Sequence, residues 1–137
     1  IGVVAPSELK RIARTADGWL PSFVAPGDAE AGWATIGEHA KEHNRSIDPE
    51  HFGVLIPYAL GEVPNALIAG LAARRPDLAD PSVLVPNTWD ALTKMIQEFI
   101  SVGASKFVVL PIVEPTSATH WISHLEEASR ILLPLQN

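Results

Sequence analysis

Short apolar runs alternate along this chain with longer segments in which apolar residues recur every three or four positions. The apolar runs, bounded by Pro, Gly and Asp, predict β-strands at 1–4, 17–23, 51–60 and 106–112. The segments with helical spacing predict α-helices near 9–14 and at 28–43, 63–75, 89–102 and 118–133. Thr88 is expected to cap the fourth helix at its start, and Gly103 to end it. Residues 74–87, which begin at the end of the third helix, are rich in Pro and Asp and fit no period, so their structure stays open.

The third apolar run, HFGVLIPYAL, is continuous rather than alternating, which is typical of a strand buried on both faces of a parallel sheet. Alternation of strands with amphipathic helices predicts an α/β fold with parallel strands and right-handed connections. The order fits half of a (β/α)8 TIM barrel, or a small open sheet with helices on both faces. A strand that begins at Ile1 favours the half barrel, because an autonomous domain rarely begins in mid-strand. We therefore expect residues 1–137 to form a single unit of this kind.

The amino-acid composition excludes several classes of function. The 137 residues, 47% of them hydrophobic, suffice for one core but not for two. Cysteine is absent, which excludes disulfides, thiolate catalysis and Cys-ligated zinc. The net charge is -6 and the basic residues are scattered, so a nucleic-acid partner is not indicated. Neither a membrane-spanning run nor a signal peptide is visible, so we expect a cytoplasmic protein with a small-molecule substrate.

Two stretches resemble a known enzyme family. The sequence IGVVAPSELKRIARTADGWLP is similar to the strand, turn and helix followed by Ala-Asp-Gly-Trp of the bacterial-luciferase-like flavin and deazaflavin oxidoreductases. The sequence NTWDALTKMIQEFISVGASKFVVLPI is similar to the last helix-strand unit of that family. The resemblance covers nearly the whole chain in the right order. It implies a TIM barrel, of which this chain would be the carboxyl-terminal half, with strands five to eight.

The resemblance also implies an activity and a cofactor. Family members transfer a hydride to or from a small organic substrate, or monooxygenate it. The residues of the first stretch favour the deazaflavin coenzyme F-420 as the cofactor, with FMN as the alternative. Residues closest to the reacting ring come in this family largely from the first four strands, so we expect this chain by itself to be inactive. The alternative function is a non-catalytic half barrel that covers its open strand edges by forming a homodimer or binding a partner.

The turn after the first strand is the strongest candidate for a cofactor site. A strand end followed by a helix start offers free amides and the positive end of a helix dipole, which suits a phosphate. The family holds its cofactor phosphate at this turn, usually with Gly and Ser, whereas Val3 and Val4 stand here and depart from that pattern. The alternative is an ordinary strand-helix turn. The candidate phosphate-binding residues are Gly2, Val3, Val4, Ala5 and Ser7.

Further candidates follow the other predicted strands, where a barrel places its active site. Trp19 is a candidate to flank the cofactor ring, although a place in the core is equally compatible with its sequence. Candidate substrate contacts are Ser22, Tyr58 and Glu114, and a solvated loop acid is the alternative for Glu114. Two histidine pairs, at 39 and 43 and at 120 and 124, have the spacing of one helix face. We expect solvated polar faces there rather than metal sites, since a third ligand is missing from both.

Overall fold

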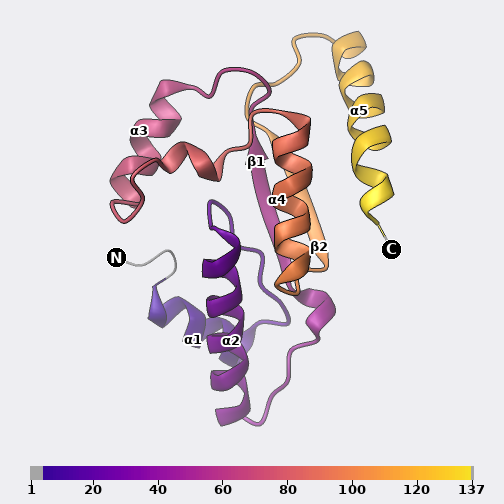
Figure 1. Ribbon diagram of the computed structural model, residues 1–137. Helices are drawn as coiled ribbons and strands as arrows, with labels where there is room; N and C mark the ends of the chain where they lie inside the picture. Colours follow the sequence, from indigo (N-terminus) through magenta and orange to yellow (C-terminus); the bar gives the residue numbers. More distant parts are fainter. Residues whose placement is uncertain (1–4, 137) are drawn as a thin grey trace.

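A computed structural model describes residues 5–136, so the strand predicted at 1–4 lies outside the described residues. The described part is an α/β structure in which α4 covers one face of a parallel strand pair and the other helices lie around its ends and edges (Figure 1). The bounds are α1 Pro6–Thr15, α2 Pro26–Glu42, β1 Gly53–Tyr58, α3 Asn65–Arg74, α4 Trp89–Ser101, β2 Lys106–Pro111 and α5 Ala118–Leu132. Three single turns of 3-10 helix are η1 Pro49–His51, η2 Pro81–Leu84 and η3 Leu133–Leu135. The α/β class and the order of helices are confirmed.

The two strands pair in parallel, with Gly53 opposite Lys106 and Tyr58 opposite Pro111. The segment predicted as the second strand is reduced to two isolated parallel bridges, Trp19 with Phe52 and Ser22 with Leu55. Pro21 lies between the bridges and has no amide hydrogen to donate, and Phe23 then takes a positive φ of 52°. These two residues interrupt the extended pairing that the apolar run predicts.

The sheet has one covered and one open face. Val54, Ile56 and Tyr58 of β1 are buried in the main core, where α4 contributes Leu92, Ile96 and Phe99. On the opposite face, Val108 and Leu110 of β2 are 46% and 50% exposed. Because side chains alternate along a strand, the covered residues face the helices and the others face away from them.

The helices begin and end where local chemistry predicts. The Thr88 hydroxyl accepts a hydrogen bond from the amide of Ala91 at 3.0 Å, and Gly103 follows α4 with a φ of 100°, so both expected caps are confirmed.

Trp19 fits against α2 at Gly32, where an added Cβ atom would lie 2.4 Å from the indole ring. Helix α5 stands at the edge of the molecule beside β2, and none of its residues is buried (Figure 1).

Candidate binding site at the carboxyl ends of the strands

A cavity of about 270 Å³ lies where β1 and β2 end. Because the strands are parallel, their carboxyl ends meet at one edge of the sheet, and the loop after β2 and the first turns of α5 close the cavity. It brings together two of the predicted substrate contacts, Tyr58 and Glu114, with two histidines that come from α5. The full lining is Tyr58, Leu60, Pro111, Val113, Glu114, Pro115, Thr116, His120 and His124.

A phenol-imidazole pair forms the inner wall of this cavity. The Tyr58 hydroxyl lies 2.5 Å from Nε2 of His124, and the two rings stack with their centroids 5.8 Å apart. Trp89 from the start of α4 and Trp121 from α5 contact the imidazole at 5.3 and 6.1 Å between ring centroids. Burial raises the pKa of the Tyr58 phenol, so its hydroxyl keeps its proton at neutral pH. The pair therefore fixes the His124 ring in the cavity wall.

The expectation of a solvated face is wrong for His124, because α5 leans its first half over the ends of the strands and presses this ring against Tyr58. His120, one turn earlier, is exposed at the same cavity, with Nδ1 3.3 Å from the Thr116 hydroxyl. The other pair behaves as expected. His39 pairs at 3.0 Å with Glu42 on the exposed surface, and this hydrogen bond lowers the pKa of the Glu42 carboxyl.

Helical spacing is the feature of the sequence that places His124 on the inner side of α5. It lies three residues after Trp121 and four before Ala128, on the stripe that predicts the inner side of α5. An imidazole on an apolar stripe needs a buried hydrogen-bond partner, and Tyr58 supplies it. Glu114 is exposed, and within residues 5–136 its carboxylate takes part in no ion pair.

Trp19 and Ser22 lie away from this cavity. Trp19 pairs with Phe52 before β1 begins, and it is only 8% exposed, with its ring stacked at 6.0 Å on that of Phe52. Its placement at the carboxyl-terminal mouth is therefore wrong, because the indole fills the core between the sheet and α2. Ser22 is exposed and pairs with Leu55 in the middle of β1.

The start of α1 is the described part of the predicted phosphate turn, since Gly2, Val3 and Val4 lie outside the described residues. Ala5 is extended, and its carbonyl accepts hydrogen bonds from the amides of Glu8 and Leu9. Ser7 is exposed in the first helical turn, where amides point away from the helix body. The Glu8 carboxylate pairs with Arg11 one turn later. The amide and the hydroxyl of Ser7 are hydrogen-bond donors at the start of a helix, where an anion would be favoured.

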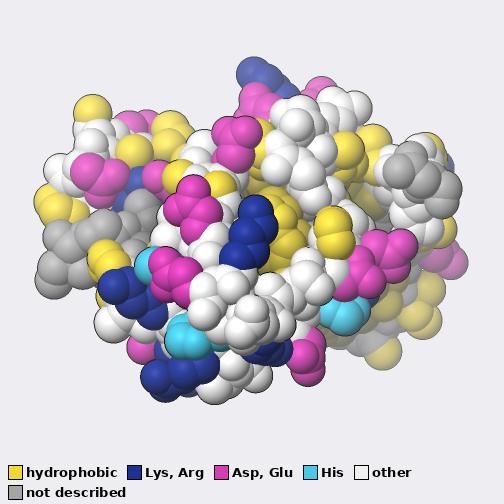
Figure 2. Space-filling view, turned by 90° about the horizontal axis from the view of Figure 1, so that it is seen from below, with side chains coloured by type: hydrophobic (Ala, Val, Ile, Leu, Met, Phe, Trp, Pro, Cys, Tyr) yellow, Lys and Arg dark blue, Asp and Glu magenta, His cyan; other side chains and the backbone are white. Residues whose placement is uncertain are grey.

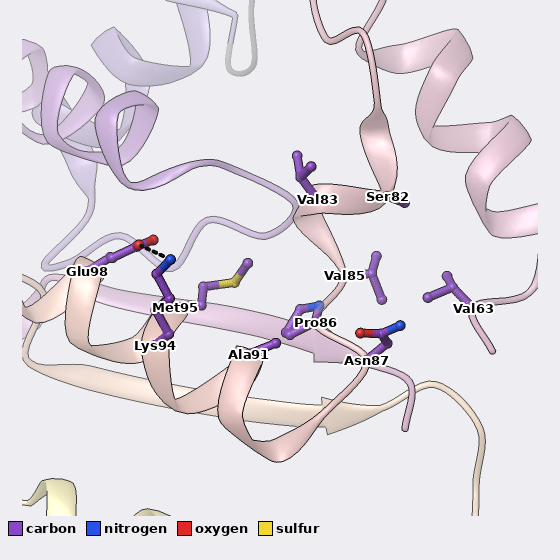
Figure 3. A pocket seen from close by; sticks show the side chains of 10 residues that line it. All are labelled: Val63, Ser82, Val83, Val85, Pro86, Asn87, Ala91, Lys94, Met95 and Glu98. Atoms are coloured by element: carbon purple, nitrogen blue, oxygen red, sulfur yellow. Dashed lines mark ion pairs between the residues drawn. The ribbon is translucent and has the colours of Figure 1, made fainter. Parts of the chain in front are cut away.

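A second cavity, of about 350 Å³, lies between η2 and α4 (Figure 3). Its wall mixes apolar and polar side chains, and the Lys94–Glu98 ion pair at 3.9 Å lies on its rim. This exposed pair is satisfied within α4 and gives the cavity no reactive group. Within residues 5–136, no three His, Asp or Glu side chains come together as metal ligands, and no helix is both long and apolar enough to cross a membrane.

No family model and no curated protein matches the sequence. Solved structures do match. An F-420-dependent secondary alcohol dehydrogenase, in complex with an F-420-acetone adduct, aligns with 77% of the chain at 18% identity and a TM-score of 0.54. The coenzyme F-420-dependent tetrahydromethanopterin reductase from Methanopyrus kandleri aligns with 97% of the chain at 17% identity and a TM-score of 0.59.

The fold is that of the luciferase-like oxidoreductases. These two structures are members of this family, so the resemblance indicated by the sequence is confirmed at the level of the fold. The chain spans 40% and 49% of their respective lengths, so the likeness extends over less than half of each structure.

Proposed function

We propose that this chain forms strands five to eight of the barrel of an F-420-dependent oxidoreductase of the luciferase-like kind. The observation that carries the proposal is the structural likeness to an F-420-dependent reductase over 97% of the chain. The parallel pairing of the strands and the cavity at their carboxyl ends support it, because TIM barrels place their active sites at that end.

Residues of this chain would contribute to the reaction at two sites, one for the cofactor and one for the substrate. Ser7, with the turn before it, would hold the cofactor phosphate at the start of α1. When bound, a deazaflavin supplies hydride transfer. Reduction of a carbonyl by hydride also needs a proton on the oxygen, and oxidation of an alcohol must remove one. Glu114 and His120, exposed at the cavity, are the groups that would hold this proton beside a small organic substrate.

Tyr58 and His124 would act as positioning residues in this arrangement. Their hydrogen bond fixes α5 across the ends of β1 and β2, and so sets where His120 and Glu114 face the cavity. A phenol that keeps its proton holds this geometry over the whole physiological pH range.

The cofactor proposal is tested by titrating the 137-residue chain with coenzyme F-420 and, separately, with FMN, and following the fluorescence of its four tryptophans. We expect F-420 to bind more tightly than FMN. The Ser7→Asp variant places a carboxylate where the phosphate would lie, so it should weaken F-420 binding about tenfold, which is a loss of about 1.4 kcal/mol. Ser46→Asp, at an exposed loop position after α2, makes the same change in charge and should leave the affinity unchanged.

Equal losses in the two variants would refute a specific role for the α1 start and leave only a general effect of charge. Tighter binding of FMN would replace the deazaflavin by a flavin in the proposal. Absence of binding by either cofactor would remove the support for cofactor binding by this part of the barrel.

A further inference from the structure

The hydrogen bond between Tyr58 and His124 has a direction that the burial of the phenol decides. Tyr58 is 2% exposed, and within residues 5–136 its hydroxyl bonds only to Nε2 of His124, at 2.5 Å. A buried hydroxyl proton without an acceptor is costly, so the phenol is the donor and Nε2 is the acceptor. A neutral imidazole carries one proton, which is therefore on Nδ1 of His124.

The rings around His124 hold its imidazole in one orientation. Tyr58 stacks on it with 4° between the ring planes, Trp89 is tilted at 41°, and Trp121 meets it edge-on at 82°. Turning the imidazole by half about its Cβ–Cγ bond would place a carbon atom against the Tyr58 hydroxyl and leave the phenol proton without an acceptor. The position of Nδ1 is therefore fixed together with that of Nε2.

The proton on Nδ1 of His124 is open to a ligand. Within residues 5–136, Nδ1 has no hydrogen-bond partner, and no side-chain nitrogen or oxygen there is both buried and unpaired. Nδ1 is therefore reached by solvent, and the imidazole lines the cavity of about 270 Å³ at the carboxyl ends of the strands. His124 thus offers an N–H donor that no described residue uses.

The rest of the cavity wall favours a ligand that has an acceptor oxygen but no negative charge. Leu60, Val113 and two prolines supply apolar surface, and Glu114 supplies a carboxylate that is in no ion pair within residues 5–136. Among the described residues, no Lys or Arg lines the cavity. A carboxylate or phosphate ligand would therefore be repelled by Glu114 at short range, whereas a ketone or an aldehyde would not.

We infer that Nδ1–H of His124 donates a hydrogen bond to the carbonyl oxygen of a small uncharged ligand, and that Tyr58 is the positioning residue that keeps the proton on Nδ1. His124 would then orient the oxygen beside Glu114 and His120, and this role at the substrate site rests on the proposed function. The donor itself arises from contacts within this chain and needs no bound cofactor.

The tautomer of His124 is measured on the wild-type chain by NMR of ¹⁵N-labelled histidine at about pH 8.5, above the ordinary pKa of an imidazole and below that of a phenol. We expect His124 to carry its proton on Nδ1. Tyr58→Phe keeps the aromatic ring but removes the donor, and should give His124 a mixture of both tautomers while His43, exposed after α2, is unchanged. A wild-type His124 protonated on Nε2 would overturn the inference.

Ligand binding is tested with butan-2-one and with propionate, which has nearly the same shape but a negative charge. Butan-2-one should shift the Nδ1 resonance of His124 and bind more tightly than propionate. His124→Phe keeps a ring in the cavity wall, and should weaken butan-2-one binding about fivefold, as expected for the loss of one neutral hydrogen bond. Tighter binding of propionate, or no shift at Nδ1 with butan-2-one, would overturn the inference.

His43→Phe is the matched control for His124→Phe. His43 follows α2 at the end of the molecule opposite the cavity (Figure 1), and Figure 2 shows that this end carries charged side chains of both signs at its surface. The control should leave butan-2-one binding unchanged, and equal losses in the two variants would refute the role of His124. A chain that binds butan-2-one through His124 but neither F-420 nor FMN would keep this carbonyl site and contradict the proposed cofactor.

Discussion

At the scale of single residues, Tyr58 reports directly on the candidate site because it is the chain's one tyrosine. Burial raises the pKa of its phenol above the ordinary value of 10.0. The stability that this group contributes is therefore complete below pH 10.0 and is lost as the pH rises through the folded-state pKa. We expect the tyrosinate absorbance of the folded chain to appear at higher pH than that of the urea-unfolded chain. Coincident titrations would show that the phenol is not buried as described.

The same residues show how far sequence predicts a site. Tyr58 and Glu114 were predictable as neighbours, because Tyr58 ends one strand, Glu114 follows the other, and parallel strands end at one edge. His124 was expected on a solvated face, because helical spacing shows which residues share a face but not whether that face is covered. Trp19 was misplaced because its sequence fits a strand end and a core equally well, and only the pairing with Phe52 decides between them.

At the scale of elements, the approach of Trp19 to α2 requires a glycine. A Cβ atom at Gly32 would lie 2.4 Å from the indole, whereas nothing lies within 4 Å of one at Gly37 in the same helix. Alanine is the better helix former by about 1 kcal/mol, so Gly37→Ala should stabilise the fold by about that amount. Gly32→Ala should instead destabilise it by about 1–3 kcal/mol through overpacking. Urea unfolding of both variants checks this, and two changes of the same sign would contradict the close approach.

Arg75 joins three parts of the structure. Its buried guanidinium donates to Asp77 in the segment after α3, to Asp28 at the start of α2 at 3.1 Å, and to the carbonyl of Phe23. Arg75→Leu removes this donor from all three acceptors and leaves Asp28 with the amide of Ala25. It should lower the free energy of unfolding by about 2–3 kcal/mol, since both carboxylates keep part of their hydration. Arg74→Leu is the control, because Arg74 is exposed and makes no ion pair within residues 5–136. Equal losses in urea unfolding would refute the role of Arg75 as a tie between elements.

Element boundaries followed from the sequence wherever a side chain marks them. Thr88 and Gly103 fixed α4 because capping is a local property. The length of the second strand was overestimated because the apolar run continues through Pro21. Proline has no amide hydrogen to donate to a neighbouring strand, and this affects the structure only where the segment has to pair.

At the scale of the whole molecule, alternation of strands and helices predicted the α/β class and the parallel sheet, and the structural likeness confirmed the family resemblance of the fold. The position of these strands within a complete barrel could not be predicted in the same way. It depends on contacts between strand-helix units, whereas the hydrophobic pattern of each unit is nearly the same at every position of a barrel.

The register of the sheet has a consequence for how the chain folds. Each paired position of β1 lies 53 residues before its partner in β2, and the Trp19–Phe52 bridge spans 33 residues. Such separations must be closed before the pairing gives any stability, so topology of this kind folds more slowly than local helix pairs. The adjacent helices α1 and α2 and the capped helix α4 can form early, whereas β2, the later partner in the sheet, waits longest with its apolar residues uncovered. The nascent chain is therefore most prone to aggregation through the strand that the native molecule leaves at its edge.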